Sequence, residues 1–74
     1  MNKRITIDPK IMVGKPVIKG TRITVELILE LLAQGQTYKE IFADYPHLTQ
    51  EDIRAAIAYA HEIISHEKVF PLSS

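Results

Sequence analysis

The chain has 74 residues, no cysteine, and nine basic against nine acidic side chains, which gives a formal net charge of zero. A chain of this length forms one domain with a small core, because folding buries only about 60% of the surface that it exposes when unfolded. Neither disulfides nor a histidine cluster at metal-ligand spacing supplements that core, so we expect a second subunit or a partner to do so. The N-terminus lacks the apolar stretch of a signal peptide and no uncharged run is long enough to cross a membrane, so we expect a cytoplasmic protein.

The charges are divided unevenly along the chain. Residues 1–22 carry six cations and one carboxylate, a net charge of +5, whereas residues 23–74 carry three cations and eight carboxylates, a net charge of −5. A basic arm on an acidic body favours binding to nucleic acid or to an acidic protein surface. The alternative is that the arm pairs with the body of its own chain or of a second subunit.

The N-terminal third predicts a small β element. Its apolar residues are mostly β-branched, and prolines and glycines between residues 8 and 20 interrupt them. This pattern predicts short strands joined by turns and excludes a helix. The strand-forming residues are Ile5, Ile7, Ile11, Val13, Val17 and Ile18. Because Pro9 and Pro16 each remove a backbone donor, we expect exposed strand edges at which a second chain can pair.

Two helices are predicted next. Residues 24–35 have the apolar period of a helix, with a glycine at the C-cap position. Thr37 and Glu40 then have the spacing of a capping box, which predicts the start of a second, short helix. That helix ends near Asp44, because Pro46 cannot donate the next helical hydrogen bond and restricts the residue before it.

Thr49, followed by Glu51 and Asp52, predicts the start of a third helix, because threonine caps a helix and carboxylates favour its positive first turn. We expect its apolar stripe and alanines to pack in the core: Ile53, Ala55, Ala56, Ile57, Ala58, Ala60 and Ile64. The predicted class is α+β and mainly helical, a β-hairpin followed by a three-helix helix-turn-helix. The helical pattern is lost after residue 64, so we expect a domain at residues 1–64 and a C-terminal tail at residues 65–74.

The histidines and carboxylates predict no enzyme site. His61 and His66 are five residues apart and diverge by about 140° on a helix, whereas a zinc-protease helix needs two histidines four apart. Glu51 and Asp52 are explained by the helix terminus at which they lie. The three glycines are too scattered for a phosphate loop. We therefore expect neither an enzyme nor a metal or other cofactor.

Candidate DNA-binding residues lie in the basic arm and at the start of the third helix. Lys15, Lys19 and Arg22 are the candidate phosphate contacts. In a helix-turn-helix protein the start of the second helix of the motif reaches the major groove, which makes Gln50 and Arg54 the candidate base-reading residues. The neighbouring carboxylates repel phosphate, so the alternative is a protein-binding scaffold that does not bind DNA.

A more specific pattern is the run Gly-Lys-Pro-Val-Ile-Lys-Gly-Thr-Arg-Ile at residues 14–23. Within it, Gly20 is expected to form a left-handed turn, beside which Thr21 and Arg22 present a hydroxyl and a guanidinium. Together with Ile-Asp-Pro at residues 7–9 and the later segments Tyr-Pro-His-Leu-Thr and Ala-Ala-Ile-Ala-Tyr-Ala, this run resembles the domain-of-unknown-function 433 family. The similarity covers about residues 5–60. It implies a β-hairpin on a homeodomain-like or winged helix-turn-helix, dimerisation, and a role as antitoxin beside a PIN-like ribonuclease toxin.

These observations predict a homodimeric, DNA-binding antitoxin of a type II toxin–antitoxin pair, which binds its toxin directly and represses its own operon. The protein-binding scaffold without DNA binding is the alternative, and a small nuclease is a third hypothesis that lacks residues to hold a metal. The apolar residues of the tail are candidate toxin-binding residues, because a short segment that orders on binding can place anchors in a partner's groove: Val69, Phe70 and Leu72. The competing interpretation is that they pack on their own domain.

Overall fold

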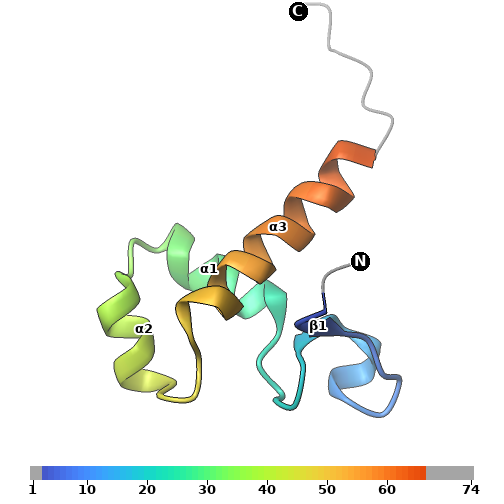
Figure 1. Ribbon diagram of the computed structural model, residues 1–74, viewed down its shortest axis with the longest axis horizontal. Helices are drawn as coiled ribbons and strands as arrows, with labels where there is room; N and C mark the ends of the chain where they lie inside the picture. Colours follow the sequence, from blue (N-terminus) through green and yellow to red (C-terminus); the bar gives the residue numbers. More distant parts are fainter. Residues whose placement is uncertain (1–2, 67–74) are drawn as a thin grey trace, which may run out of the picture.

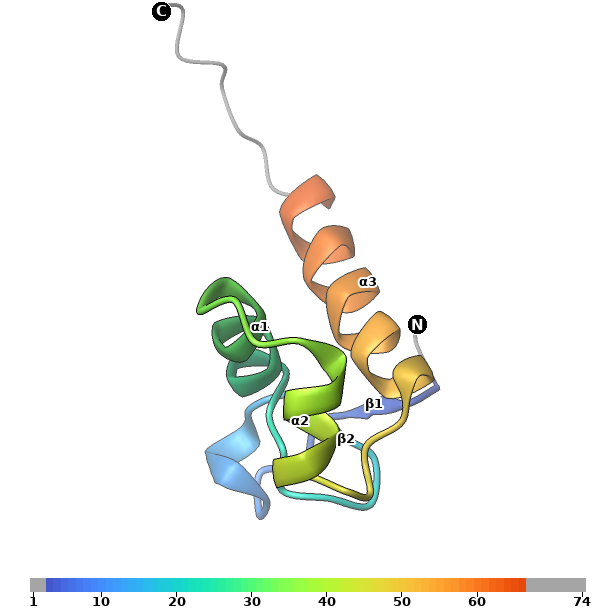
Figure 2. The same cartoon turned by 90° about the vertical axis from the view of Figure 1, so that its left-hand side faces the viewer.

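A computed structural model describes residues 3–66 and places a β-hairpin beside three helices (Figure 1). In chain order the elements are β1 (Ile5–Thr6), the turn η1 (Met12–Gly14), β2 (Val17–Ile18), α1 (Val25–Ala33), α2 (Tyr38–Asp44) and α3 (Gln50–His66). The predicted α+β class and the order of hairpin and helices are confirmed. Figure 2 shows β1 passing beneath the first turn of α3, with α1 and α2 to one side.

The two strands form a short antiparallel hairpin. Ile5 lies opposite Ile18, and Thr6 lies opposite Val17. Ile5, Val17 and Ile18 are buried, so the hairpin contributes apolar side chains to the core beneath α3. The hairpin therefore fixes the basic N-terminal segment against the helical body.

The connection between the strands differs from the prediction. Ile7 is exposed, and Ile11 caps the turn η1 instead of continuing a strand. Met12, Val13 and Gly14 all have positive φ angles of 49°, 57° and 77°, and Val13 is 94% exposed. Three consecutive left-handed residues reverse the chain, so the apolar residues at 7, 11 and 13 form a loop and were wrongly assigned to strands.

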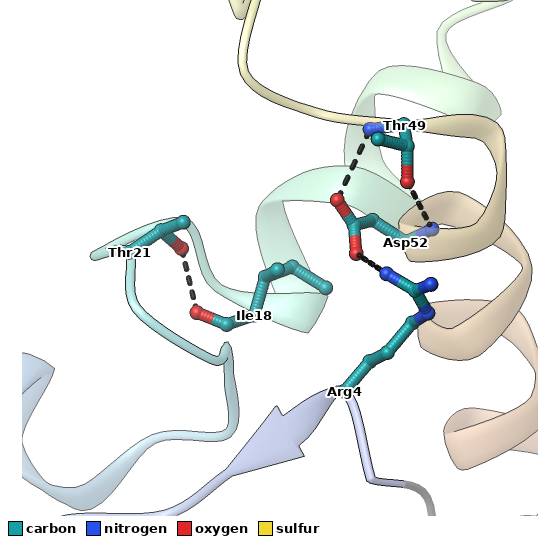
Figure 3. Close-up of polar contacts among 5 residues, drawn as sticks. All are labelled: Arg4, Ile18, Thr21, Thr49 and Asp52. Carbon is teal, nitrogen blue, oxygen red and sulfur yellow. Dashed lines mark hydrogen bonds and ion pairs between the residues drawn. The ribbon is translucent and has the colours of Figure 1, made fainter.

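The turn after β2 is organised by a threonine. The Thr21 hydroxyl donates to the Ile18 carbonyl oxygen at 2.7 Å (Figure 3). It also accepts from the Ile23 N–H at 3.0 Å. Gly20 has the expected left-handed backbone, with φ at 81°. Because both hydrogen bonds of the hydroxyl are internal, Thr21 serves the turn, and Arg22 beside it is exposed.

Each helix begins at its predicted signal, and α1 and α2 also end where predicted. Thr24 caps α1 through the Leu27 N–H, and Gly35, with φ at 87°, follows its last turn. Thr37 and Glu40 form the full capping box of α2. Thr49 caps α3 through the N–H of Asp52. These caps satisfy backbone donors that the first turn of a helix leaves without partners, which explains why the boundaries follow the sequence closely.

The core lies where α1 and α3 cross above the hairpin. Ile28, Ile41 and Ile53, one from each helix, are fully buried. Leu48 from the turn before α3 and the small Ala56 are buried with them, and the small side chain allows α1 and α3 to approach closely. One apolar cluster thus joins the hairpin and all three helices.

The second half of α3 departs from the prediction. Its buried residues all lie between positions 52 and 56, whereas Ile57 and Ile64 are 41% and 63% exposed and Ala58 is also exposed. The helix continues to His66, two residues beyond the predicted boundary. The prediction that these residues pack in the core was wrong, because the helix extends past the elements that cover its first half (Figure 1).

Candidate nucleic-acid interface

An ion pair between the hairpin and α3 organises the candidate site. The Arg4 guanidinium lies 3.0 Å from a carboxylate oxygen of Asp52, and the other carboxylate oxygen accepts the Thr49 N–H at 3.0 Å (Figure 3). The Asp52 side chain is 10% exposed, so its charge is compensated by these two donors and not by solvent. The contact fixes the basic segment before β1 against the first turn of α3.

Two adjoining hollows flank this ion pair. The first, about 230 Å³, lies between the hairpin and α3 and is lined by Lys3, Arg4, Ile18, Lys19 and Asp52. The second, about 300 Å³, runs along α3 and is lined by Arg4, Glu51, Arg54, Ala55 and Ala58. Together these linings hold four cations and two carboxylates, a net charge of +2 on a chain that is neutral overall. We call this surface the cationic face.

The structure brings only some of the predicted DNA-binding residues together. Lys19 and Arg54 both lie on the cationic face, and Gln50 is exposed at the first position of α3. Arg22 is exposed on the turn after β2 but lines neither hollow. Lys15 lies apart, in a different groove.

Lys15 forms an ion pair with Glu26 in the first turn of α1, at 2.9 Å between Nζ and Oε1. The hydrogen bond to Glu26, with the charge of that carboxylate, raises the pKa of Lys15, and the same bond and charge lower the pKa of Glu26. Both side chains are exposed, so the pair adds little stability. Lys15 is therefore paired on another surface and does not line the cationic face.

Sequence reasoning missed Lys3 and Arg4 as individual site residues. The strand register brings them to the site: Ile5 lies opposite Ile18, so the residues that flank these two positions also face each other, and the Lys19 N–H donates to the Arg4 carbonyl oxygen at 2.7 Å. Ala58 was also missed, because its spacing was assigned to the core. An exposed alanine is small enough for the major groove of DNA to approach the helix, and its methyl group can contact a thymine methyl group.

The expected repulsion between phosphate and the first turn of α3 is reduced by the ion pair. Of the two carboxylates there, Asp52 is buried and compensated by Arg4, while Glu51 is exposed. Arg54 follows Glu51 by three residues and therefore lies beside it on the helix surface. The first turn of α3 thus presents one exposed carboxylate among the surrounding cations.

Two further features bear on other classes of site. Among residues 3–66, no group of three histidine, aspartate or glutamate side chains lies close enough to hold a metal ion. In the same part of the chain, none of the helices combines the length and apolar character needed to span a membrane. The candidate toxin-binding residues Val69, Phe70 and Leu72 lie outside the described residues.

Comparisons with known proteins define the class of this helix-turn-helix domain. The profile of the family described as "Protein of unknown function (DUF433)" matches residues 5–60. The crystal structure of a DUF433 member from Anabaena variabilis superposes with a TM-score of 0.78 and 37% sequence identity, over 84% of this chain and 61% of that one. The chain belongs to the DUF433 family, as its sequence resemblance implied.

Two relatives by sequence are described as "Uncharacterized protein". One, y4eO from Sinorhizobium fredii, is 36% identical over 56 residues, which are 76% of this chain but 25% of the relative. The other, from Archaeoglobus fulgidus, is 67% identical over 24 residues, 32% of this chain and 67% of the relative. The chain therefore spans about a quarter of the length of the Sinorhizobium relative.

Proposed function

We propose that this chain is a DNA-binding antitoxin, a homodimer that binds operator DNA through the cationic face, represses its own operon and neutralises a PIN-like ribonuclease toxin by direct binding. The observation that supports DNA binding is the clustering of Lys3, Lys19 and Arg54 around the exposed start of α3. These cations come from three separate places in the sequence, so their clustering is a property of the fold. Phosphate contacts of this kind supply most of the affinity of DNA-binding proteins.

Within the cationic face the residues divide into two roles. Lys3 and Lys19, on the hairpin, are placed to contact phosphates beside the helix. Gln50, Arg54 and Ala58, on α3, are the candidate residues that reach base edges in the major groove. Arg4 is a positioning residue, because its guanidinium holds the Asp52 carboxylate in place.

DNA binding is tested by fluorescence anisotropy with a duplex from upstream of the gene and a random duplex of equal length, from 50 to 200 mM salt. With two phosphate contacts per subunit, from Lys3 and Lys19, the logarithm of the association constant should fall with the logarithm of salt concentration with a slope of about −4 for a dimer. Tighter binding to the upstream duplex is expected. If neither duplex is bound at 50 mM salt, the result would favour the alternative, a protein-binding scaffold that does not bind DNA.

Neutralisation of a toxin is the part of the proposal that rests on the family resemblance. It is tested by co-expressing this chain with a neighbouring PIN-like reading frame in cells whose growth that reading frame arrests. Restored growth and co-purification of the two proteins are the expected results. Continued arrest, with both proteins present in soluble form, would contradict the antitoxin role without affecting DNA binding.

A further inference from the structure

A third hollow lies away from the cationic face and shares none of its lining residues. This groove has a volume of about 330 Å³ and lies between α1 and the second half of α3. One wall is formed by Pro16, Val25 and Leu29, and the other by Tyr59, Ile63 and Ile64. The side chains lining both walls are mainly apolar, so water is a poor occupant of the groove.

The groove continues the core without being covered. At 100° per residue, Ala60 and Ile63 lie on the same stripe of α3 as the buried Ile53 and Ala56. Yet none of residues 57–66 is buried, and Ile63 and Ile64 are 45% and 63% exposed. Figures 1 and 2 both show this half of α3 projecting beyond the rest of the domain. A core-facing stripe therefore extends onto a half of α3 that no other element among residues 3–66 covers.

This extension, residues 57–66, is ten residues long. Its own hydrogen bonds are not enough to stabilise it, because isolated helices below about 12–15 residues are marginal in water. Packing of the apolar face is the usual source of the missing stability. The same extension is itself an apolar ridge, which gives the chain a groove and a ridge on one surface. Self-complementary surfaces of this kind are what a twofold dimer needs, since each copy offers the same patch to the other.

The rim of the groove adds charge complementarity. It carries one cation, Lys15, and one anion, Glu26, which are 56% and 73% exposed. In a twofold dimer the cation on the rim of one copy meets the anion on the rim of the other. Lys15 of one copy can therefore pair with Glu26 of the other instead of with its own Glu26. A rim of one charge sign would instead repel a second copy.

We propose that this groove is the dimer interface, and that its occupant is the second half of α3 from a second copy, packed antiparallel so that Ile63 and Ile64 of each copy enter the groove of the other. The proposal rests on the homodimer of the proposed function and names its interface. It places dimerisation on α3 and not on the exposed strand edges that the sequence suggested.

This arrangement leaves both cationic faces free. If the two helices cross at Ile63, the two Arg54 residues lie about 27 Å apart and the two Gln50 residues about 39 Å apart along the pair, at 1.5 Å per residue. Half-sites on DNA are separated by about 34–36 Å for one helical turn. The groove-mediated dimer therefore places its base-reading residues at a separation that brackets one turn of DNA.

The first test compares sedimentation of the full chain and two variants from 1 to 200 μM, without DNA. Ile64→Glu places a charge in the interface at an exposed position, so it should remain folded by circular dichroism and shift the dimer dissociation constant at least 100-fold. Val13→Glu is the matched control, an equally drastic change at an exposed residue of the η1 turn, and should dimerise like the unmodified chain. Equal dimerisation of Ile64→Glu and the unmodified chain would overturn the proposed interface while leaving a homodimer in place.

The second test uses the rim charges and needs no apolar substitution. Lys15→Glu gives a rim with two anions, and Glu26→Lys gives a rim with two cations, so each variant alone should dimerise about tenfold more weakly. Mixing the two should restore assembly as heterodimers, which mass spectrometry of the mixture measures. Failure of the mixture to associate more tightly than either variant would contradict contact across the rims.

Deletion of residues 67–74 distinguishes a second copy from the chain's own C-terminal segment as occupant. The deletion variant should dimerise like the full chain. A full chain that is monomeric at 200 μM, and dimerises only after the deletion, would assign the groove to residues 67–74. If both the full chain and the deletion variant are monomeric, the homodimer of the proposed function is overturned together with this interface. DNA binding is measured separately, so a monomer that binds DNA would leave that part of the proposed function intact.

Discussion

The contact between Arg4 and Asp52 joins the two regions that the charge pattern separates, the basic arm and the acidic body. Together with the Lys15–Glu26 ion pair, it is the predicted alternative in which the arm pairs with its own body. The pairing is partial. Lys3 and Lys19 lie beside this contact on the same face, so the arm both docks on the body and contributes cations to a surface.

Replacing Asp52 with alanine removes the acceptor of the Thr49 N–H and the counter-ion of Arg4. Because Asp52 is buried, we expect the free energy of unfolding, measured by urea denaturation, to decrease by about 1–3 kcal/mol. Glu26→Gln, which breaks the exposed ion pair with Lys15, is the control and, at protein concentrations at which both variants are monomeric, should change stability little. Equal effects of the two substitutions would show that burial does not strengthen the Arg4–Asp52 contact.

Replacing Lys19 with alanine should weaken binding to the upstream and the random duplex by the same factor, because phosphate contacts carry no sequence information. The salt slope should become less steep by about 2 for a dimer that loses one contact per subunit. Lys10→Ala removes a lysine that lines neither hollow and should leave the slope unchanged. Arg54→Ala should instead reduce the preference for the upstream duplex.

Among the elements, the helices were predicted more accurately than the hairpin loop. Caps such as Thr37 with Glu40 are local, and local hydrogen bonds are readable from residue spacing. The left-handed turn through Val13 could not be predicted from the sequence, because valine rarely adopts a positive φ and its β-branched side chain is typical of strands. The cationic face was predicted only in part, since Lys3, Lys19 and Arg54 meet through long-range packing that spacing does not encode.

The α2 helix has seven residues and depends on its capping box. Thr37→Ala removes the side-chain half of that box and should lower the free energy of unfolding by about 1 kcal/mol. Hydrogen–deuterium exchange of the α2 amides should increase more than that of α1. Thr37→Ser keeps the hydroxyl and should behave like the unmodified protein, and a loss of stability in that variant would assign the effect to the threonine methyl group.

The same box predicts a pH dependence. Hydrogen bonds from the Thr37 backbone N–H and then from its side chain lower the pKa of Glu40 below its ordinary value of 4.5. A lowered pKa in the folded state gives a stabilisation that is present above pH 4.5 and is lost as the pH falls through the folded value. The stability difference between the unmodified chain and Glu40→Gln should therefore shrink below pH 4.5, and a difference that stays constant down to pH 2.5 would contradict this assignment.

At the scale of the whole molecule, three surfaces have separate tasks in this account. The cationic face is proposed to bind DNA, the apolar groove is proposed to bind a second copy, and residues 68–74 are the candidate toxin-binding segment. The separation depends on the length of α3, because its first half supports the cationic face and its second half supports the groove. A helix that ended at Ala56 would retain the buried core and lose the groove.

Deleting residues 68–74 tests the third task. If the segment binds the toxin, the melting temperature should stay nearly unchanged and neutralisation in the growth assay should be lost. If Phe70 packs on the domain instead, the free chain should be destabilised by about 1.5–3 kcal/mol, the contribution of one large buried side chain. Lower stability with neutralisation intact would end the docking hypothesis.

A backbone amide NMR titration of the dimer with the upstream duplex locates the DNA-binding surface directly. Chemical shifts should change at Lys3, Lys19, Gln50, Arg54 and Ala58, whereas those of Ile63 and Ile64, in the proposed dimer interface, should change little. Changes confined to the groove, or spread evenly over hairpin and helices, would contradict a DNA-binding surface at the start of α3.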